Sequence, residues 1–203
     1  MSAQPVEPTP QATYYQLRDL ADDFAAAADR RGERVRAEIT DNRIDIVMMS
    51  PTKRHGRIVS LLTRQIENQD ERAATMAETK IEHPELGFYR TADLVVMSQA
   101  AYEASDDDAP AFAPDVDLAV EVVSKSNPEN DYIKKLRDYP RMGVPCYTIV
   151  DPRDGTISVH SSPGTIGGLP QYRDHKRYVF GDKVRMGQWL IDTAEFPRHQ
   201  PHA

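Results

Sequence analysis

The segment from Asp117 to Val123 constrains the fold more than any other part of the chain. Its residues are mostly apolar, yet Glu121 lies in the middle of it. Side chains alternate along a strand, so Glu121 shares a face with Ala119 and Val123, while Leu118, Val120 and Val122 point the other way. A buried, ionised carboxylate costs on the order of several kcal/mol unless it is paired or binds a metal. The segment predicts a buried strand with a specialised carboxylate or, in the plainer interpretation, an edge strand whose Glu121 faces solvent.

The other segments alternate between helical and extended patterns. Helical spacing predicts helices over 14–28, 55–68 and 127–142, the last with Asn127 as N-cap and a kink at Pro140. Extended segments are predicted at 35–49 (a hairpin turning at Asp41-Asn42), 73–82, 87–97, 117–123, 146–150 and 156–160, followed by a Gly/Pro-rich loop over 161–175 and a last strand near Trp189. This order predicts an α/β fold with a mixed central sheet flanked by helices.

Composition limits the class of protein. The 203 residues suit one domain, which we place at 13–197, between a disordered tail at 1–12 and a short tail at 198–203. No apolar run approaches the ~20 residues that span a bilayer, and the single cysteine, Cys146, is expected to be buried packing. We expect a cytoplasmic protein with no membrane contact. The net charge of −7 argues against strong non-specific binding to nucleic acid, but is compatible with an acidic metal site.

Two further positions carry charged side chains next to apolar patterns. Asp93 begins a second apolar strand, and carboxylates on adjacent strands can together hold Mg²⁺. The plainer interpretation is that Asp93 caps a loop. Asp131 and Lys135 are spaced i,i+4 on the helix after the Glu121 strand. They form either a surface ion pair worth ~0.3–0.5 kcal/mol, or a pair whose helix directs Lys135 at the metal centre.

Several spaced segments, taken together, resemble the Uma-two family of restriction endonucleases, which belongs to the PD-(D/E)XK nuclease superfamily. The matching segments are 114–126, Asp131 to Lys135, Tyr139, 143–145 and 147–152, with further matches at Glu38, 49–51, His55, Asp93 and 192–197. Each piece is weak alone, but the agreement over 114–152 is specific. The resemblance covers roughly residues 14–197 and implies a restriction-endonuclease-like core.

The resemblance implies roles for three residues. Asp93 and Glu121 match the two acidic positions of the superfamily motif, although Ala92 stands where the motif has proline. Val123 occupies the position of the motif lysine and cannot replace it. Lys135, on the following helix, fits the place from which this family supplies its lysine.

Further roles follow from the same resemblance. Lys125 and Lys134 are less suitable substitutes for the lysine. Glu38 matches an additional acidic position and is expected to add a metal ligand, while Asp131 is expected to orient Lys135. His55 opens its helix, where it either contacts substrate or caps the helix.

These residues imply an Mg²⁺-dependent endonuclease, with Mn²⁺ as a possible substitute, that hydrolyses DNA through a metal-activated water. Cutting both strands is simplest for a two-fold homodimer. The alternative is a catalytically inactive domain of the same fold that binds nucleic acid or protein. Ala92, Val123 and the net acidity favour this alternative, and the joint presence of Asp93, Glu121 and Lys135 favours the enzyme.

Overall fold

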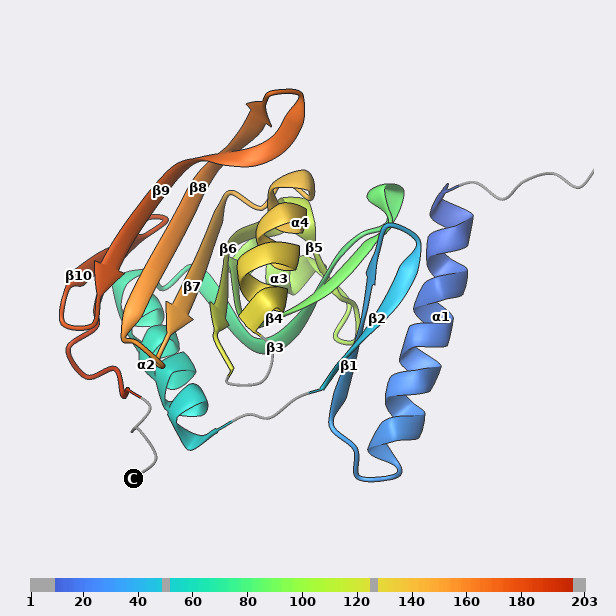
Figure 1. The fold of residues 1–203 in the computed structure, drawn as a ribbon, viewed down its shortest axis with the longest axis horizontal. Helices are drawn as coiled ribbons and strands as arrows, with labels where there is room; N and C mark the ends of the chain where they lie inside the picture. Colours follow the sequence, from blue (N-terminus) through green and yellow to red (C-terminus); the bar gives the residue numbers. More distant parts are fainter. Residues whose placement is uncertain (1–9, 49–51, 125–127, 199–203) are drawn as a thin grey trace, which may run out of the picture.

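The secondary structure was obtained from a computed structural model that describes residues 10–48, 52–124 and 128–198 (Figure 1). The helical segments are α1 (Pro10–Asp29), α2 (Lys53–Gln69), η1 (Pro84–Leu86), α3 (Gln99–Ala104), η2 (Ala113–Asp115), η3 (Asn130–Lys135) and α4 (Leu136–Arg141). The strands are β1 (Val35–Thr40), β2 (Arg43–Met48), β3 (Ala73–His83), β4 (Phe88–Ser98), β5 (Ala111–Phe112), β6 (Val116–Val122), β7 (Cys146–Asp151), β8 (Thr156–Ile166), β9 (Leu169–Val179), β10 (Lys183–Met186) and β11 (Trp189–Asp192).

The centre of the molecule is a nine-stranded mixed sheet with the order β2-β1-β4-β6-β7-β8-β9, in which β3 also pairs with β4 and β5. Most pairs are antiparallel, but β6 and β7 are parallel and are joined by the crossover that contains η3 and α4. This arrangement confirms the predicted α/β fold with a mixed sheet flanked by helices. Within the described residues, no helix combines the length and apolar character needed to cross a membrane.

Strand β4 is where the sheet divides. One edge of β4 pairs with β3 along its whole length. The other edge pairs with β1 only at Tyr89, and with β6 from Leu94 onward. The backbone between these two points therefore lacks a continuous neighbouring strand, and its polar groups need other partners. Side chains from β1 and η3 bind the backbone N–H and carbonyl of Thr91 in this gap, and the candidate site lies at this division.

The two faces of the sheet bury different apolar sets. Leu118, Val120 and Val122 of β6 pack with α2 and β10–β11 on one face, whereas Ala119 and Val123 pack with α4 on the other. This is the alternation predicted for the Glu121 segment. A third cluster joins α1 to β1, and Figure 1 shows α1 beside the β1–β2 hairpin at one end of the sheet.

Two features differ from the sequence-based expectations. The segment over 161–175, predicted as a loop, belongs to the long β8–β9 hairpin, which turns at Gly167-Gly168 where both φ angles are positive. The Gly/Pro content had been interpreted as irregular structure, although Pro163 is tolerated in a strand at the margin of the sheet. Helix α1 begins at Pro10, so residues 10–12, which were predicted to be part of the disordered tail, are helical. The predicted cap Asn127, residues 49–51 and most of both tails lie outside the described residues.

Candidate active site

Asp93 and Glu121 lie on paired strands. Leu94 of β4 pairs with Val120 of β6 in antiparallel register, so Asp93 and Glu121 occupy the next opposed positions. Asp93 is 4% exposed and Glu121 1% exposed. The solvent-facing interpretation of Glu121 is therefore wrong, and so is the interpretation of Asp93 as a loop cap, because Asp93 lies in the middle of β4.

The side chain of Asp93 closes the gap between β4 and β6. Its Oδ2 accepts a hydrogen bond from the backbone N–H of Val122 at 2.9 Å. Its Oδ1 accepts from both Nη1 and Nη2 of Arg36, each at 3.0 Å. His55 Nε2 lies 3.5 Å from Oδ2. His55 does not cap α2, since the cap is Thr52, whose Oγ1 accepts from the backbone N–H of His55.

Lys135 lies at the centre of the cluster of carboxylates. Its Nζ is 2.8 Å from Glu121 Oε1, 3.6 Å from Glu38 Oε1 and 3.9 Å from Asp131 Oδ1. It also donates at 2.6 Å to the carbonyl of Thr91, which lies on the divided edge of β4. Burial alone would lower the pKa of Lys135, but the three carboxylates raise it above its ordinary value. The side chain is only 1% exposed, so its pair with Asp131 is not the surface pair of the plainer interpretation.

A π-helix positions Lys135. The sequence predicts a regular α-helix here, whereas Asn130–Lys135 form the π-helical segment η3 before α4 begins. The hydroxyl of Tyr147 donates at 2.9 Å to the backbone carbonyl of Asp131 and anchors this segment to β7. Such wider turns occur frequently at functional sites. Of the substitute lysines, Lys134 is 47% exposed and pairs with Asp45, and Lys125 lies outside the described residues.

Glu38 lies beside this centre but is engaged by other donors. Its Oε2 accepts from Arg90 Nη1 at 2.7 Å, and its Oε1 accepts from the backbone N–H of Thr91 at 3.2 Å. Arg90 also binds Asp138 of α4 through Nε at 3.0 Å and through Nη2. Glu38, Arg90 and Asp138 are all completely buried. Burial would raise the pKa of Glu38, but Lys135 and Arg90 together lower it below its ordinary value.

Negative charge predominates in the cluster. The buried carboxylates Glu38, Asp93, Glu121 and Asp131 outnumber their cationic neighbours Arg36, Arg90 and Lys135, whereas Asp138 is paired with Arg90, Arg137 and Arg141.

Burial among these charges changes the pKa values of Glu121 and Asp131. Burial raises the pKa of Glu121 well above its ordinary value, Lys135 opposes this increase, and Asp93 adds to it. Burial also raises the pKa of Asp131 to about 7. An additional positive charge at the site would therefore favour the ionised forms of Glu121 and Asp131.

Asp93 and Glu121 are the residues of this site that could together hold a divalent cation. Mg²⁺ binds carboxylate oxygens, needs few of them and retains several waters. Asp93 and Glu121 are such donors, from neighbouring strands. In the described parts of the chain, no group of three or more His, Cys, Asp or Glu side chains is arranged so that it could hold a metal ion. Asp93 is instead paired with Arg36, and Glu121 with Lys135.

Sequence reasoning missed Arg36, Arg90 and Tyr139 as parts of the site. Tyr139 donates at 3.2 Å to Glu121 Oε1 and fixes this carboxylate. Two signals were available: Arg36 shares strand parity with Glu38, and Arg90 interrupts the apolar run of β4 just as Glu121 interrupts β6. A buried acid in one strand calls for a buried base in another.

The backbone beside Asp93 is also unusual. Glu78 of β3 lies opposite Asp93, between the pairs Ala77–Leu94 and Thr79–Ala92. Its φ of 50° is in the left-handed region, which a non-glycine residue rarely adopts inside a strand. Such backbone conformations concentrate at functional sites.

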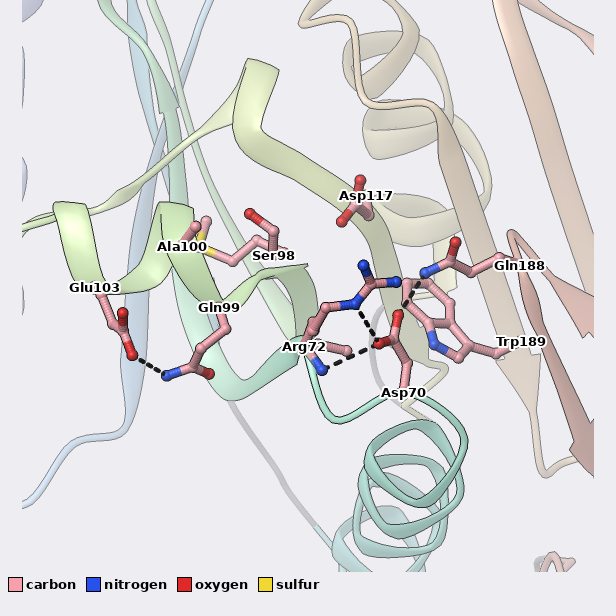
Figure 2. Close-up of a pocket in the computed structure, with 11 residues that line it drawn as sticks. Asp70, Arg72, Ser98, Gln99, Ala100, Glu103, Asp117, Gln188 and Trp189 are labelled. Carbon is pink, nitrogen blue, oxygen red and sulfur yellow. Dashed lines mark hydrogen bonds and ion pairs between the residues drawn. The ribbon is translucent and has the colours of Figure 1, made fainter.

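A separate pocket lies at the far end of the same strands (Figure 2). It has a volume of about 410 Å³ and is lined by, among others, Asp70, Arg72, Asp117 and Trp189. Asp117 and Glu121 are both on β6, which separates the pocket from the acidic cluster by roughly 13 Å at ~3.3 Å per residue. The pocket contains none of the residues predicted for the site, so chemistry and not cavity size identifies the candidate active site.

Comparison with known proteins shows the fold and the family of the chain. The chain matches a solved structure from Anabaena variabilis, described as a "putative nuclease belonging to DUF820", with a TM-score of 0.60 and 15% identity over 79% of this chain and 89% of that one. This likeness shows the fold. No curated protein matches the chain. Residues 21–190 match the model of the family Uma2, described as "Putative restriction endonuclease". The chain therefore belongs to the Uma2 family.

Proposed function

We propose that this protein is a divalent-metal-dependent endonuclease that hydrolyses phosphodiester bonds in DNA. The observation that carries the proposal is the buried pair Asp93 and Glu121 on neighbouring strands, with Lys135 Nζ 2.8 Å from Glu121. Structural ion pairs can also be buried, but here burial leaves Glu121 with a raised pKa despite its lysine. A cluster with unbalanced negative charge is expensive for stability and is typical of functional sites.

Asp93 and Glu121 are the proposed ligands of Mg²⁺, or of Mn²⁺ in its place. The bound ion would supply Lewis acidity to the phosphate and acidity to a water molecule. Tyr139 and the backbone N–H of Val122 hold the two carboxylates in place. Glu38 has both oxygens engaged by protein donors, and we assign it the balancing of charge on Arg90 and Lys135. The ammonium of Lys135, held near Asp131, provides positive charge for the phosphate as negative charge develops on it.

Replacing Lys135 separates metal binding from hydrolysis. We expect Lys135→Met to slow nicking of supercoiled plasmid by about 10²–10³-fold, the effect of removing one electrostatic stabiliser. Mn²⁺ affinity, measured by calorimetry, should be unchanged or higher, because a positive charge next to Glu121 is removed. Lys134→Met is the matched control, since Lys134 is the neighbouring, half-exposed lysine. A Lys134 variant that loses nicking while the Lys135 variant retains it would assign the lysine role to Lys134.

The alternative function, a non-catalytic domain that binds nucleic acid or protein, is favoured by one observation: Arg36 and Lys135 already engage the two carboxylates. It predicts that neither Mg²⁺ nor Mn²⁺ supports cleavage of DNA or RNA by the wild-type protein, and that Glu121→Gln leaves any nucleic-acid affinity unchanged. We favour the enzyme because a binding domain has no need for a buried excess of carboxylates. We propose that the protein acts in the cytoplasm.

The assembly that suits this activity is a homodimer. One site cuts one strand at each visit, so a two-fold pair of sites is the simplest arrangement for cutting both strands. Light scattering at micromolar concentration should give twice the mass of the 22.9 kDa chain. A mass of one chain across that range would contradict the dimer without affecting the assignment of the site.

A further inference from the structure

Arg36 differs from the other cationic groups of the cluster in how it is held. Arg90 is completely buried between Glu38 and Asp138, and Lys135 is 1% exposed among three carboxylates and the carbonyl of Thr91. Among the described residues, the side chain of Arg36, which is 14% exposed, pairs with Asp93 at 3.0 Å and with Glu78 at 3.9 Å. It is the cation that can leave the cluster at the lowest cost.

Arg36 binds one of the two carboxylate oxygens of Asp93, the Oδ1 atom. Asp93 Oδ2 accepts from the backbone N–H of Val122 and faces His55. Among the described residues, Oδ1 accepts hydrogen bonds from Arg36 only, through both of its terminal nitrogens at 3.0 Å. Oδ1 is therefore the oxygen that a metal ion can take without disturbing the pairing of β4 with β6, and Arg36 must release it.

A second carboxylate lies within reach of the displaced guanidinium. Glu78 Oε1 is 3.9 Å from Arg36 Nη2, and the side chain of Glu78 is 52% exposed. Glu78 is also the residue with positive φ opposite Asp93. Arg36 thus lies between a buried carboxylate and one at the surface.

We propose that Arg36 is a displaceable counter-ion of Asp93 and, once a divalent cation takes Oδ1, becomes the group that binds the substrate phosphate. This inference rests on the proposed function and adds a residue to it. The planar fork of arginine matches phosphate oxygens in a bidentate manner. Before a metal ion binds, Arg36 neutralises the charge of Asp93. After the ion binds, it neutralises that charge itself, and the guanidinium of Arg36 is free to bind the phosphate. Metal binding and phosphate binding are coupled through one side chain.

The test is Arg36→Gln, which removes the charge but keeps a polar side chain of similar reach. Its two effects should have opposite signs. Calorimetry without DNA should show Mn²⁺ binding about tenfold tighter than wild type, because the competing cation is gone. At saturating Mn²⁺, kcat/KM for a labelled DNA duplex should fall about 100-fold, mainly through KM. The matched control is Arg72→Gln, since the side chain of Arg72 is 91% exposed and distant from the site.

Arg36→Lys provides a second variant if the glutamine variant does not fold. Lysine keeps the charge but loses the fork, so Mn²⁺ affinity should stay within about twofold and kcat/KM should fall about tenfold. Unchanged or weaker Mn²⁺ binding by Arg36→Gln would overturn the counter-ion role. Wild-type cleavage by both variants would overturn the phosphate role. A wild-type protein that binds no Mn²⁺ and cuts nothing would instead refute the proposed function, which separates the two failures.

Discussion

Glu121→Gln is expected to abolish cleavage while leaving the fold intact. The substitution keeps the size of the side chain and removes a metal-ligand charge, so nicking should fall on the order of 10²–10³-fold or more. Lys135 keeps Glu38 and Asp131 as partners at 3.6 and 3.9 Å, so it is not left unpaired. Because burial already disfavours the charge on Glu121, and Lys135 retains two other carboxylates, metal-free stability should not fall. Plasmid nicking and urea denaturation measure the two effects.

The matched control for this variant is Glu85→Gln, the same chemical change at an exposed position in η1. It should cut and unfold as the wild-type protein does. If Glu121→Gln lost more than about 2 kcal/mol of stability, the main role of Glu121 would be to stabilise the fold through its pair with Lys135. That result would contradict a functional role for the carboxylate.

Arg90→Met is expected to cause a large loss of stability. The substitution leaves Glu38 and Asp138 buried without the guanidinium that contacts both of them. Breaking a buried ion pair in this way costs about 3–5 kcal/mol, against a total of about 5–15 kcal/mol for a typical domain. The free energy of unfolding should fall by that amount in urea.

Two further variants test the cause. Arg72→Met makes the same substitution at a highly exposed arginine and should leave stability within about 0.5 kcal/mol of wild type. Combining Arg90→Met with Glu38→Gln should recover part of the loss, since one unpaired buried charge is removed. If the free energy of unfolding of Arg90→Met stayed within about 1 kcal/mol of wild type, the charge of Asp138 would be neutralised by Arg137 and Arg141. Both arginines reach Asp138 from the surface.

Local pattern was sufficient to predict the strands that carry the acids. The alternation around Glu121 correctly separated the two core faces, because strand parity depends only on neighbouring residues. The turn at Asp41-Asn42 was confirmed for the same reason: both residues adopt positive φ, which short polar side chains tolerate.

Features that depend on tertiary contacts could not be predicted in this way. The π-helix that positions Lys135 is fixed partly by Tyr147 on β7, far along the chain. The role of Arg36 depends on β1 and β6 meeting the same edge of β4 at different points. The β8–β9 hairpin was missed because its glycines and Pro163 obscured an extended pattern. For the π-helix and for Arg36, the tertiary partner and not the local sequence determines the conformation.

Titration of Mn²⁺ into the wild-type protein and into Glu121→Gln tests the central claim most directly, with plasmid nicking followed on the same samples. The account predicts binding of the ion at the acidic cluster and ion-dependent nicking by the wild-type protein, and the loss of both in the variant. Wild-type protein that binds no divalent ion, and that nicks neither DNA nor RNA in Mg²⁺ or Mn²⁺, would contradict it.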